Sequence, residues 1–169
     1  MQKVKLVLAE CYANACFAEA VVERLGVSVK PRHSYKLGRD RILKKAQRAL
    51  NELASDELAL IVIDHERGES ARKYVNTLFG EDAIYQDDKV YIGVFKGDKR
   101  LIAVIFDPDI EEFLCKATGR YCDEEERKAL KRGGLERVCE KLRELLNSAL
   151  SKVVDDIVNA LRKRLGQPT

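Results

Sequence analysis

Apolar residues fall into two patterns along the first half of the chain, short continuous runs and longer stretches with helical spacing. The continuous runs, rich in aliphatic residues, are typical of strands buried in a parallel sheet. They cover residues 4–10, 27–31 and 58–64. The stretches with apolar positions three and four residues apart predict helices. They cover residues 13–25, 39–53 and 69–79. This alternation predicts an α/β fold, with a mostly parallel sheet flanked by helices.

Two further apolar runs, at 89–95 and 100–106, are separated by the turn-forming residues 96–99. Such a pattern predicts two strands joined as a hairpin. Asp107 then stands where it can cap a helix over 108–118, with proline at the first helical position.

The remainder of the chain is predicted to be helical. Acidic residues at 123–126 are placed where a helix begins and its dipole favours negative charge. A pair of glycines at 133–134 interrupts the pattern, and an apolar stripe then extends over 135–165. A straight helix of that length would span about 46 Å, more than one small sheet can cover. We therefore expect either a bend near 147–148 or a homodimer that uses the stripe over 138–161.

The length of 169 residues suits one compact unit, in which we distinguish an α/β domain at 1–119 from a C-terminal helical extension at 120–169. Charged residues make up 35% of the chain, a profile typical of heat-adapted proteins. The net charge of +3 is too small to indicate nucleic-acid binding by itself. No apolar run is long enough to cross a membrane, so we expect a soluble, cytoplasmic protein.

Cysteine spacing argues against a structural zinc site. No Cys-x-x-Cys pair occurs, and only two histidines are present. We expect Cys11 and Cys16 to be small core residues. A disulfide between Cys115 and Cys122 is compatible with a hyperthermophilic source, where intracellular proteins use disulfides.

Acidic residues end two of the predicted strands. Glu10 ends the first, and Asp64, followed by Glu66, ends the third. Ligand sites gather at the carboxyl ends of parallel strands, so these carboxylates converge if the two strands are neighbours. Such hard oxygen ligands suit Mg²⁺ or Mn²⁺. The alternative is that Asp64 or Glu66 only caps the following helix. His65 should point to the opposite side, as a structural or exposed residue.

The segments "VKLVLAECYANACFAEAVVERLG" and "LALIVIDHERGE" resemble the Toprim domain of topoisomerases, primases, small nucleases and OLD-type nucleases. In that family a glutamate ends the first strand and an Asp-x-Asp pair follows a later one. The resemblance covers residues 3–118 and implies a Toprim-like, Rossmann-like fold. It implies that Glu10 acts as general acid or base, while Asp64 and Glu66 hold the metal. "LIAVIFDPDIEEFL" is also similar, and Glu111 or Glu112 would be its additional acid.

The function implied by this resemblance is Mg²⁺-dependent phosphodiester chemistry on DNA or RNA, as in a nuclease. The chain departs from the family at Cys11 (family Gly), Asn14 (family Asp) and Glu66 (family Asp). These departures favour an alternative, a catalytically inactive module that binds nucleic acid or protein. A third class, small nucleotide binders, is disfavoured because the chain has no Gly-rich phosphate loop.

Basic residues are concentrated between residues 30 and 48, where eight Lys or Arg stand against a single acid, Asp40. We expect Arg32, Lys36 and Arg39 to contact phosphate, because a loop that enters a helix start offers backbone N–H groups to anions. The alternative is a solvated helix face, which is what most charge runs are.

Overall fold

The computed structural model describes residues 2–33, 38–79, 85–86 and 89–167. Lys36, one of the predicted phosphate contacts, lies outside these residues. Within the described ranges, no helix is both long and apolar enough to cross a membrane.

The core of the fold is a sheet in which the described residues form six strands, in the order β2-β1-β3-β6-β5-β4. The strands are β1 (Lys3–Ala9), β2 (Arg32–His33), β3 (Glu57–Asp64), β4 (Tyr85–Gln86), β5 (Val90–Val94) and β6 (Leu101–Phe106). Neighbours from β2 to β6 pair in parallel, whereas β5 pairs antiparallel with β6 and with β4. The predicted mostly parallel α/β sheet and the predicted hairpin are both confirmed.

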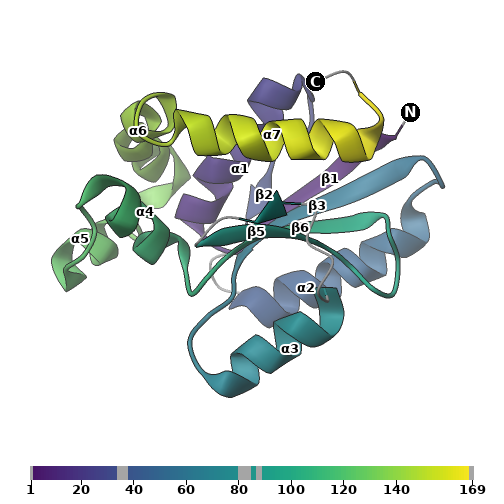
Figure 1. Cartoon of the computed structure of the whole chain (residues 1–169), viewed down its shortest axis with the longest axis horizontal. Coiled ribbons are helices and arrows are strands. Elements are labelled where there is room, and N and C mark those ends of the chain that lie inside the picture. Colours follow the sequence, from purple (N-terminus) through teal and green to yellow (C-terminus); the bar gives the residue numbers. More distant parts are fainter. Residues whose placement is uncertain (1, 34–37, 80–84, 87–88, 168–169) are drawn as a thin grey trace.

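Helices cover both faces of the sheet, which gives three layers (Figure 1). They are α1 (Tyr12–Leu25), α2 (Gly38–Ala49), α3 (Glu69–Phe79), α4 (Ile110–Thr118), α5 (Glu124–Ala129), α6 (Gly134–Asn147) and α7 (Ser151–Leu165). A short 3-10 helix, Leu50–Glu52, follows α2. Alternate residues of β3 enter different layers: Leu60 and Val62 pack with α1, α6 and α7, and Ile61 and Ile63 pack with α2 and α3. Burial on both faces explains why these strands read as continuous apolar runs.

Two predicted boundaries were wrong. The second strand is Arg32–His33 instead of 27–31. Helix α4 begins at Ile110, with Asp109 as its N-cap, because the Asp109 side chain accepts a hydrogen bond from Glu112 N. Asp107, the predicted cap, instead forms an ion pair with Arg72, in which Asp107 Oδ1 lies 2.7 Å from Arg72 Nη2.

Of the two alternatives for the long C-terminal stripe, the structure shows the bend near 147–148: α6 ends at Asn147 and α7 begins at Ser151. Arg24 of α1 secures the bend by donating hydrogen bonds to Leu146 O and Ser151 O. The stripe is buried within the same chain, in the apolar core that it shares with α1 and one face of the sheet. Its buried members include Val138, Leu142, Leu146, Leu150, Val154, Ile157 and Leu161. The homodimer stays a prediction. The apolar stripe no longer supports it, because the stripe is covered within the chain itself.

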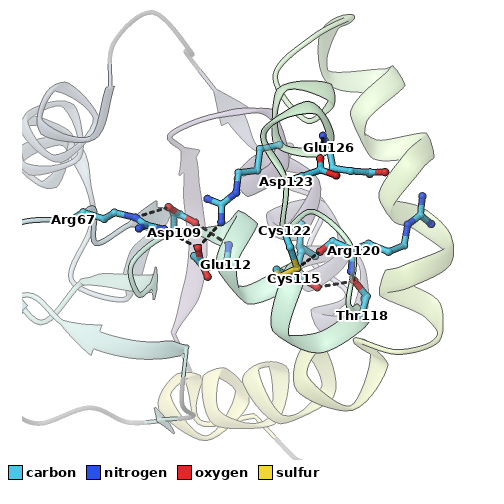
Figure 2. Close-up of a disulfide and its surroundings, with 11 residues drawn as sticks. Arg67, Asp109, Glu112, Cys115, Thr118, Arg120, Cys122, Asp123 and Glu126 are labelled. Carbon is cyan, nitrogen blue, oxygen red and sulfur yellow. Dashed lines mark hydrogen bonds and ion pairs between the residues drawn. A yellow bond between two sulfur atoms is a disulfide. The ribbon is translucent and has the colours of Figure 1, made fainter.

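Two disulfides tie the helices together. Cys16 of α1 is bonded to Cys139 of α6, and Cys115 of α4 to Cys122, with Cα atoms 5.1 Å apart in each pair. Figure 2 shows the second of them beside the start of α5. Cys16 is buried, as predicted, but it is a bonded cysteine and not merely a small core residue. Cys11 is a free thiol.

Candidate active site at the carboxyl end of the sheet

The first two acids meet because β1 and β3 are neighbouring parallel strands. Ala9 lies opposite Val62 in the register, and Glu10 N donates to Val62 O (3.1 Å). Asp64 N in turn donates to Glu10 Oε2 (2.9 Å). The two strand ends therefore place both acidic residues at the same edge of the sheet.

A pocket of about 410 Å³ lies at this edge. Its lining residues come from the end of β1 and the start of α1, the end of β3 and the loop after it, the starts of α2 and α4, and the segment between α5 and α6. They are Glu10, Cys11, Tyr12, Gly38, Asp64, Glu66, Arg67, Asp109, Glu111 and Lys131. All three acids predicted from the strand ends line it. Of the two predicted α4 acids, Glu111 does so as well, whereas Glu112 pairs with Arg67 and Arg127.

Asp64 is held by two donors on the same carboxylate oxygen. Asn14 Nδ2 and Ile110 N each donate to Asp64 Oδ1, both at 3.0 Å. Asp64 therefore accepts the first N–H of α4, which is distant in sequence, and α3, the helix that follows it, begins only at Glu69. This is not the local capping of the next helix that the alternative interpretation requires.

The loop after β3 carries Glu66 in a left-handed backbone conformation, with φ of 68°. A residue with a side chain adopts that region rarely, and then mostly where the surroundings hold it. Here His65 N donates to Phe106 O and Glu66 N donates to Pro108 O, both at 2.7 Å. Arg39 Nη1 adds a hydrogen bond to His65 O and lies 3.8 Å from Glu66 Oε2. The main chain at Glu66 is therefore held by the segment that follows β6, and Arg39 of α2 lies beside the carboxylate.

Burial and crowding raise the pKa of three of these acids, Glu10, Asp64 and Glu111. The pKa of Glu10 is raised to about 8, chiefly by burial and also by the neighbouring Glu66 charge, against the lowering effect of the hydrogen bond from Asp64 N. Burial also raises the pKa of Asp64 well above its ordinary value, with contributions from the charges of Glu10 and Glu111. The pKa of Glu111 is raised chiefly by burial. A positively charged ligand would relieve this repulsion.

The raised pKa values predict that the metal-free protein becomes more stable as pH falls from about 8.5 to about 5. The pKa of Glu10 is 4.5 in the unfolded chain and about 8 in the folded protein, so in that window the folded protein holds a proton that the unfolded chain releases. The stabilisation contributed by the Glu10 proton is therefore present near pH 5 and is lost as pH rises through 8. A pKa that differs by one between the folded and unfolded chain corresponds to about 1.4 kcal/mol, or about 3–6 °C in Tm for a chain of this size.

Thermal unfolding at several pH values in the presence of a chelator measures this effect. Glu10→Gln should flatten the dependence, because the amide does not titrate. Asp98 and Glu112, whose pKa values are lowered, affect stability only at more acidic pH. A wild-type Tm that rises with pH across this window would contradict the assignment.

His65 lies away from the pocket and is buried, with 2% of its surface exposed. Its ring neighbours Tyr91, and Nε2 lies 3.5 Å from Asn76 Oδ1. The expectation that it points to the other side and serves a structural purpose agrees with this position.

Of the three predicted phosphate contacts, the described residues include Arg32 and Arg39. Arg32 is exposed on β2 and is not among the residues that line the pocket. Arg39 is 6% exposed, and its guanidinium contacts Asp40, the main chain at His65 and the Tyr74 ring. Such burial does not fit an exposed phosphate contact by Arg39, which instead supports the loop of Glu66. Phosphate binding by Arg32 and Lys36 stays a prediction.

Besides the lining residues Cys11, Tyr12 and Gly38, four polar residues in or near the pocket were not predicted from the sequence as members of the site: Asn14, Arg67, Asp109 and Lys131. Asn14 stands out in the sequence only as a departure from the family pattern, although a buried amide one helical turn after Glu10 is a usable signal. Lys131 comes from the helical extension, and no local pattern indicates which face of the sheet that segment approaches.

Among the described residues, no group of three or more His, Cys, Asp or Glu is arranged to hold a metal ion by itself. Comparison with family models, with curated proteins and with solved structures found no match to this chain. Arguments about function therefore rest on the pocket itself.

Proposed function

We propose that this chain is a Toprim-like protein that carries out divalent-metal-dependent phosphodiester chemistry on nucleic acid. The observation that carries the proposal is the convergence of Glu10, Asp64, Glu66 and Glu111 on one pocket at the carboxyl end of a parallel sheet. The likeness of residues 3–118 to Toprim domains adds to it.

The donor set of the pocket fits Mg²⁺ or Mn²⁺. Carboxylate oxygens are the ligands these ions prefer, and Mg²⁺ usually takes one or two of them and completes its shell with water and substrate phosphate. The lack of a ready cluster of three or more ligands among the described residues is compatible with that mode of binding. Mutual repulsion among Glu10, Asp64 and Glu111 is a further reason for a cation to bind here.

In this proposal Asp64 and Glu66 hold the cation, which when bound polarises a phosphoryl oxygen and lowers the pKa of a water molecule. Glu10 holds or accepts a proton at its carboxyl group, for which a pKa of about 8 is well placed near neutral pH. Asn14 and Ile110 N fix the orientation of Asp64. Arg39 fixes the loop that carries Glu66.

One observation favours the alternative, a binding module without catalysis. Both proposed cation ligands already have protein partners: Asp64 accepts from the Asn14 amide, and Glu66 lies 3.8 Å from the Arg39 guanidinium. Asn14 occupies one oxygen of Asp64, and Arg39 neutralises part of the charge that would attract a cation. The module would bind nucleic acid with no metal requirement.

A cleavage assay separates the two functions. Labelled single-stranded DNA, duplex DNA and RNA are incubated with the protein in Mn²⁺, in Mg²⁺ and in excess chelator. The proposal predicts cleavage of at least one substrate that stops in chelator and returns with added Mn²⁺. Nucleic-acid binding that is unchanged by chelator, without cleavage of any of the three, would favour the module.

A further inference from the structure

We propose that the helical extension supplies the pocket with a phosphate-binding side chain, Lys131, which together with Arg67 forms a basic rim beside the acidic residues. The inference rests on the proposed function, since it names the phosphate of a nucleic-acid substrate as the group held by the same pocket. It concerns a part of the chain that the Toprim resemblance does not cover.

Lys131 is presented to the pocket from a fixed main chain. It follows α5, and its neighbour Leu130 is buried in the core with 1% of its surface exposed. Lys131 N donates to Lys128 O (3.0 Å). The side chain itself is 66% exposed, and its Nζ lies 3.9 Å from Glu111 Oε1. The backbone is thus anchored while the ammonium group remains able to meet a ligand.

Contacts between α4 and α5 hold this segment against the pocket. The Cys115–Cys122 disulfide joins α4 to the chain just before α5, and Asp123 caps α5 by accepting from Glu126 N (2.8 Å) (Figure 2). Arg127 of α5 forms an ion pair with Glu112 of α4. Arg67, from the loop after β3, donates to the same Glu112 carboxylate (2.7 Å). Glu112 therefore links the rim residue Arg67 to the helix that precedes Lys131.

The charge of the pocket lining explains why its two basic side chains matter for phosphate binding. Of the described residues that line the pocket, five are acidic and two, Arg67 and Lys131, are basic. A phosphate group cannot approach five acids unless cations offset their charge, and a metal ion alone contacts only some of its oxygens. The contact of Lys131 with Glu111 is long, at 3.9 Å, and the Lys131 side chain is 66% exposed although that of Glu111 is buried. The Lys131 ammonium group can therefore turn to a phosphate oxygen at the mouth of the pocket while it stays near Glu111.

A simpler role for Lys131 would be to balance the charge of Glu111. In that case its removal would alter the titration of Glu111 and the stability of the protein but not its affinity for phosphate. The two roles differ in the binding of a phosphate-bearing ligand, and the chain contains a matched control. Lys128 lies on α5, is 50% exposed and pairs with Glu124, and it is not among the lining residues.

Fluorescence anisotropy with a labelled single-stranded oligonucleotide, in Ca²⁺ to limit cleavage, tests the inference. Lys131→Gln should weaken binding by about fivefold or more and lower the slope of log affinity against log salt by about 0.7, the loss of one phosphate contact. Lys131→Arg should restore affinity to within about threefold, and Lys128→Gln should leave it within about twofold of wild type. Thermal unfolding of each variant confirms that it is folded.

Equal effects of Lys131→Gln and Lys128→Gln, or no effect of either, would overturn the inference. So would a wild-type protein that binds Mn²⁺ but no oligonucleotide, a result that leaves the cation site in place. Failure of the proposed function has a different signature, namely no Mn²⁺ binding and no metal-dependent cleavage by the wild-type protein.

Discussion

Replacing Asp64 with asparagine should reduce metal-dependent cleavage by about 100-fold or more, because a bound cation contributes several kcal/mol of transition-state stabilisation. The variant should remain folded. Asparagine is nearly isosteric, and its Oδ1 can accept the same hydrogen bonds from Asn14 Nδ2 and Ile110 N. The substitution also removes a buried carboxylate that is repelled by Glu10 and Glu111. In chelator at pH 8, the Tm of Asp64→Asn should equal or exceed that of wild type.

Asp156→Asn provides the control for this prediction. Asp156 lies on α7, pairs with Lys152, and is not among the residues that line the pocket. Its replacement changes the net charge by the same amount and should leave cleavage within about twofold of wild type. Rates are measured at several Mn²⁺ concentrations, so that weakened metal binding is separated from slower chemistry. An Asp64→Asn variant that cleaves as fast as wild type would exclude Asp64 as a metal ligand.

Removing the Cys16–Cys139 disulfide should have the largest effect on stability. The bond closes a loop with a sequence separation of 123 residues, so in the chain-entropy account its loss costs about 5 kcal/mol. It joins α1, which lies directly on the sheet, to α6, the first of the two long C-terminal helices. The double variant Cys16→Ser/Cys139→Ser should therefore unfold at a much lower denaturant concentration than wild type.

The second disulfide offers a matched comparison within the chain. Cys115 and Cys122 are only seven residues apart, and the same relation gives about 2.5 kcal/mol for the loss of that bond. Guanidinium unfolding without reductant is measured for wild type and for both double serine variants. The midpoint should fall about twice as far for the long loop as for the short one. Equal midpoints in all three proteins would show that neither bond forms in solution.

Much of the fold follows from patterns visible in the sequence. Strands buried on both faces leave continuous apolar runs, so β1 and β3 were predicted within a residue at each end. The acids Glu10 and Asp64 stand directly where those runs end, and the rule that sites gather at the carboxyl ends of parallel strands indicated that they meet if the two strands are neighbours. The adjacency of β1 and β3 itself came only from the structure. The break near Asn147 was one of two alternatives, the other being a homodimer, because one straight helix would overrun the sheet.

The features that were missed depend on contacts between distant segments. Nothing local to Cys16 indicates Cys139, since the pairing requires α6 to pack on α1. The choice between Glu111 and Glu112 depends on the rotation of α4 about its axis, which the backbone contact of Ile110 N with Asp64 helps to set. Arg39 belongs to a basic stretch that looks solvated, yet it is buried beneath the loop of Glu66. Tertiary packing, and not residue type, decides such cases.

The central claim is that the carboxylate pocket binds a divalent cation, and calorimetric titration of Mn²⁺ into the metal-free protein tests it most directly. Wild type, Asp64→Asn and Asp156→Asn are titrated side by side at pH 8. We predict one saturable site in wild type and in Asp156→Asn, and loss of that site in Asp64→Asn. No saturable binding by wild type, or binding that is unchanged in Asp64→Asn, would contradict the account.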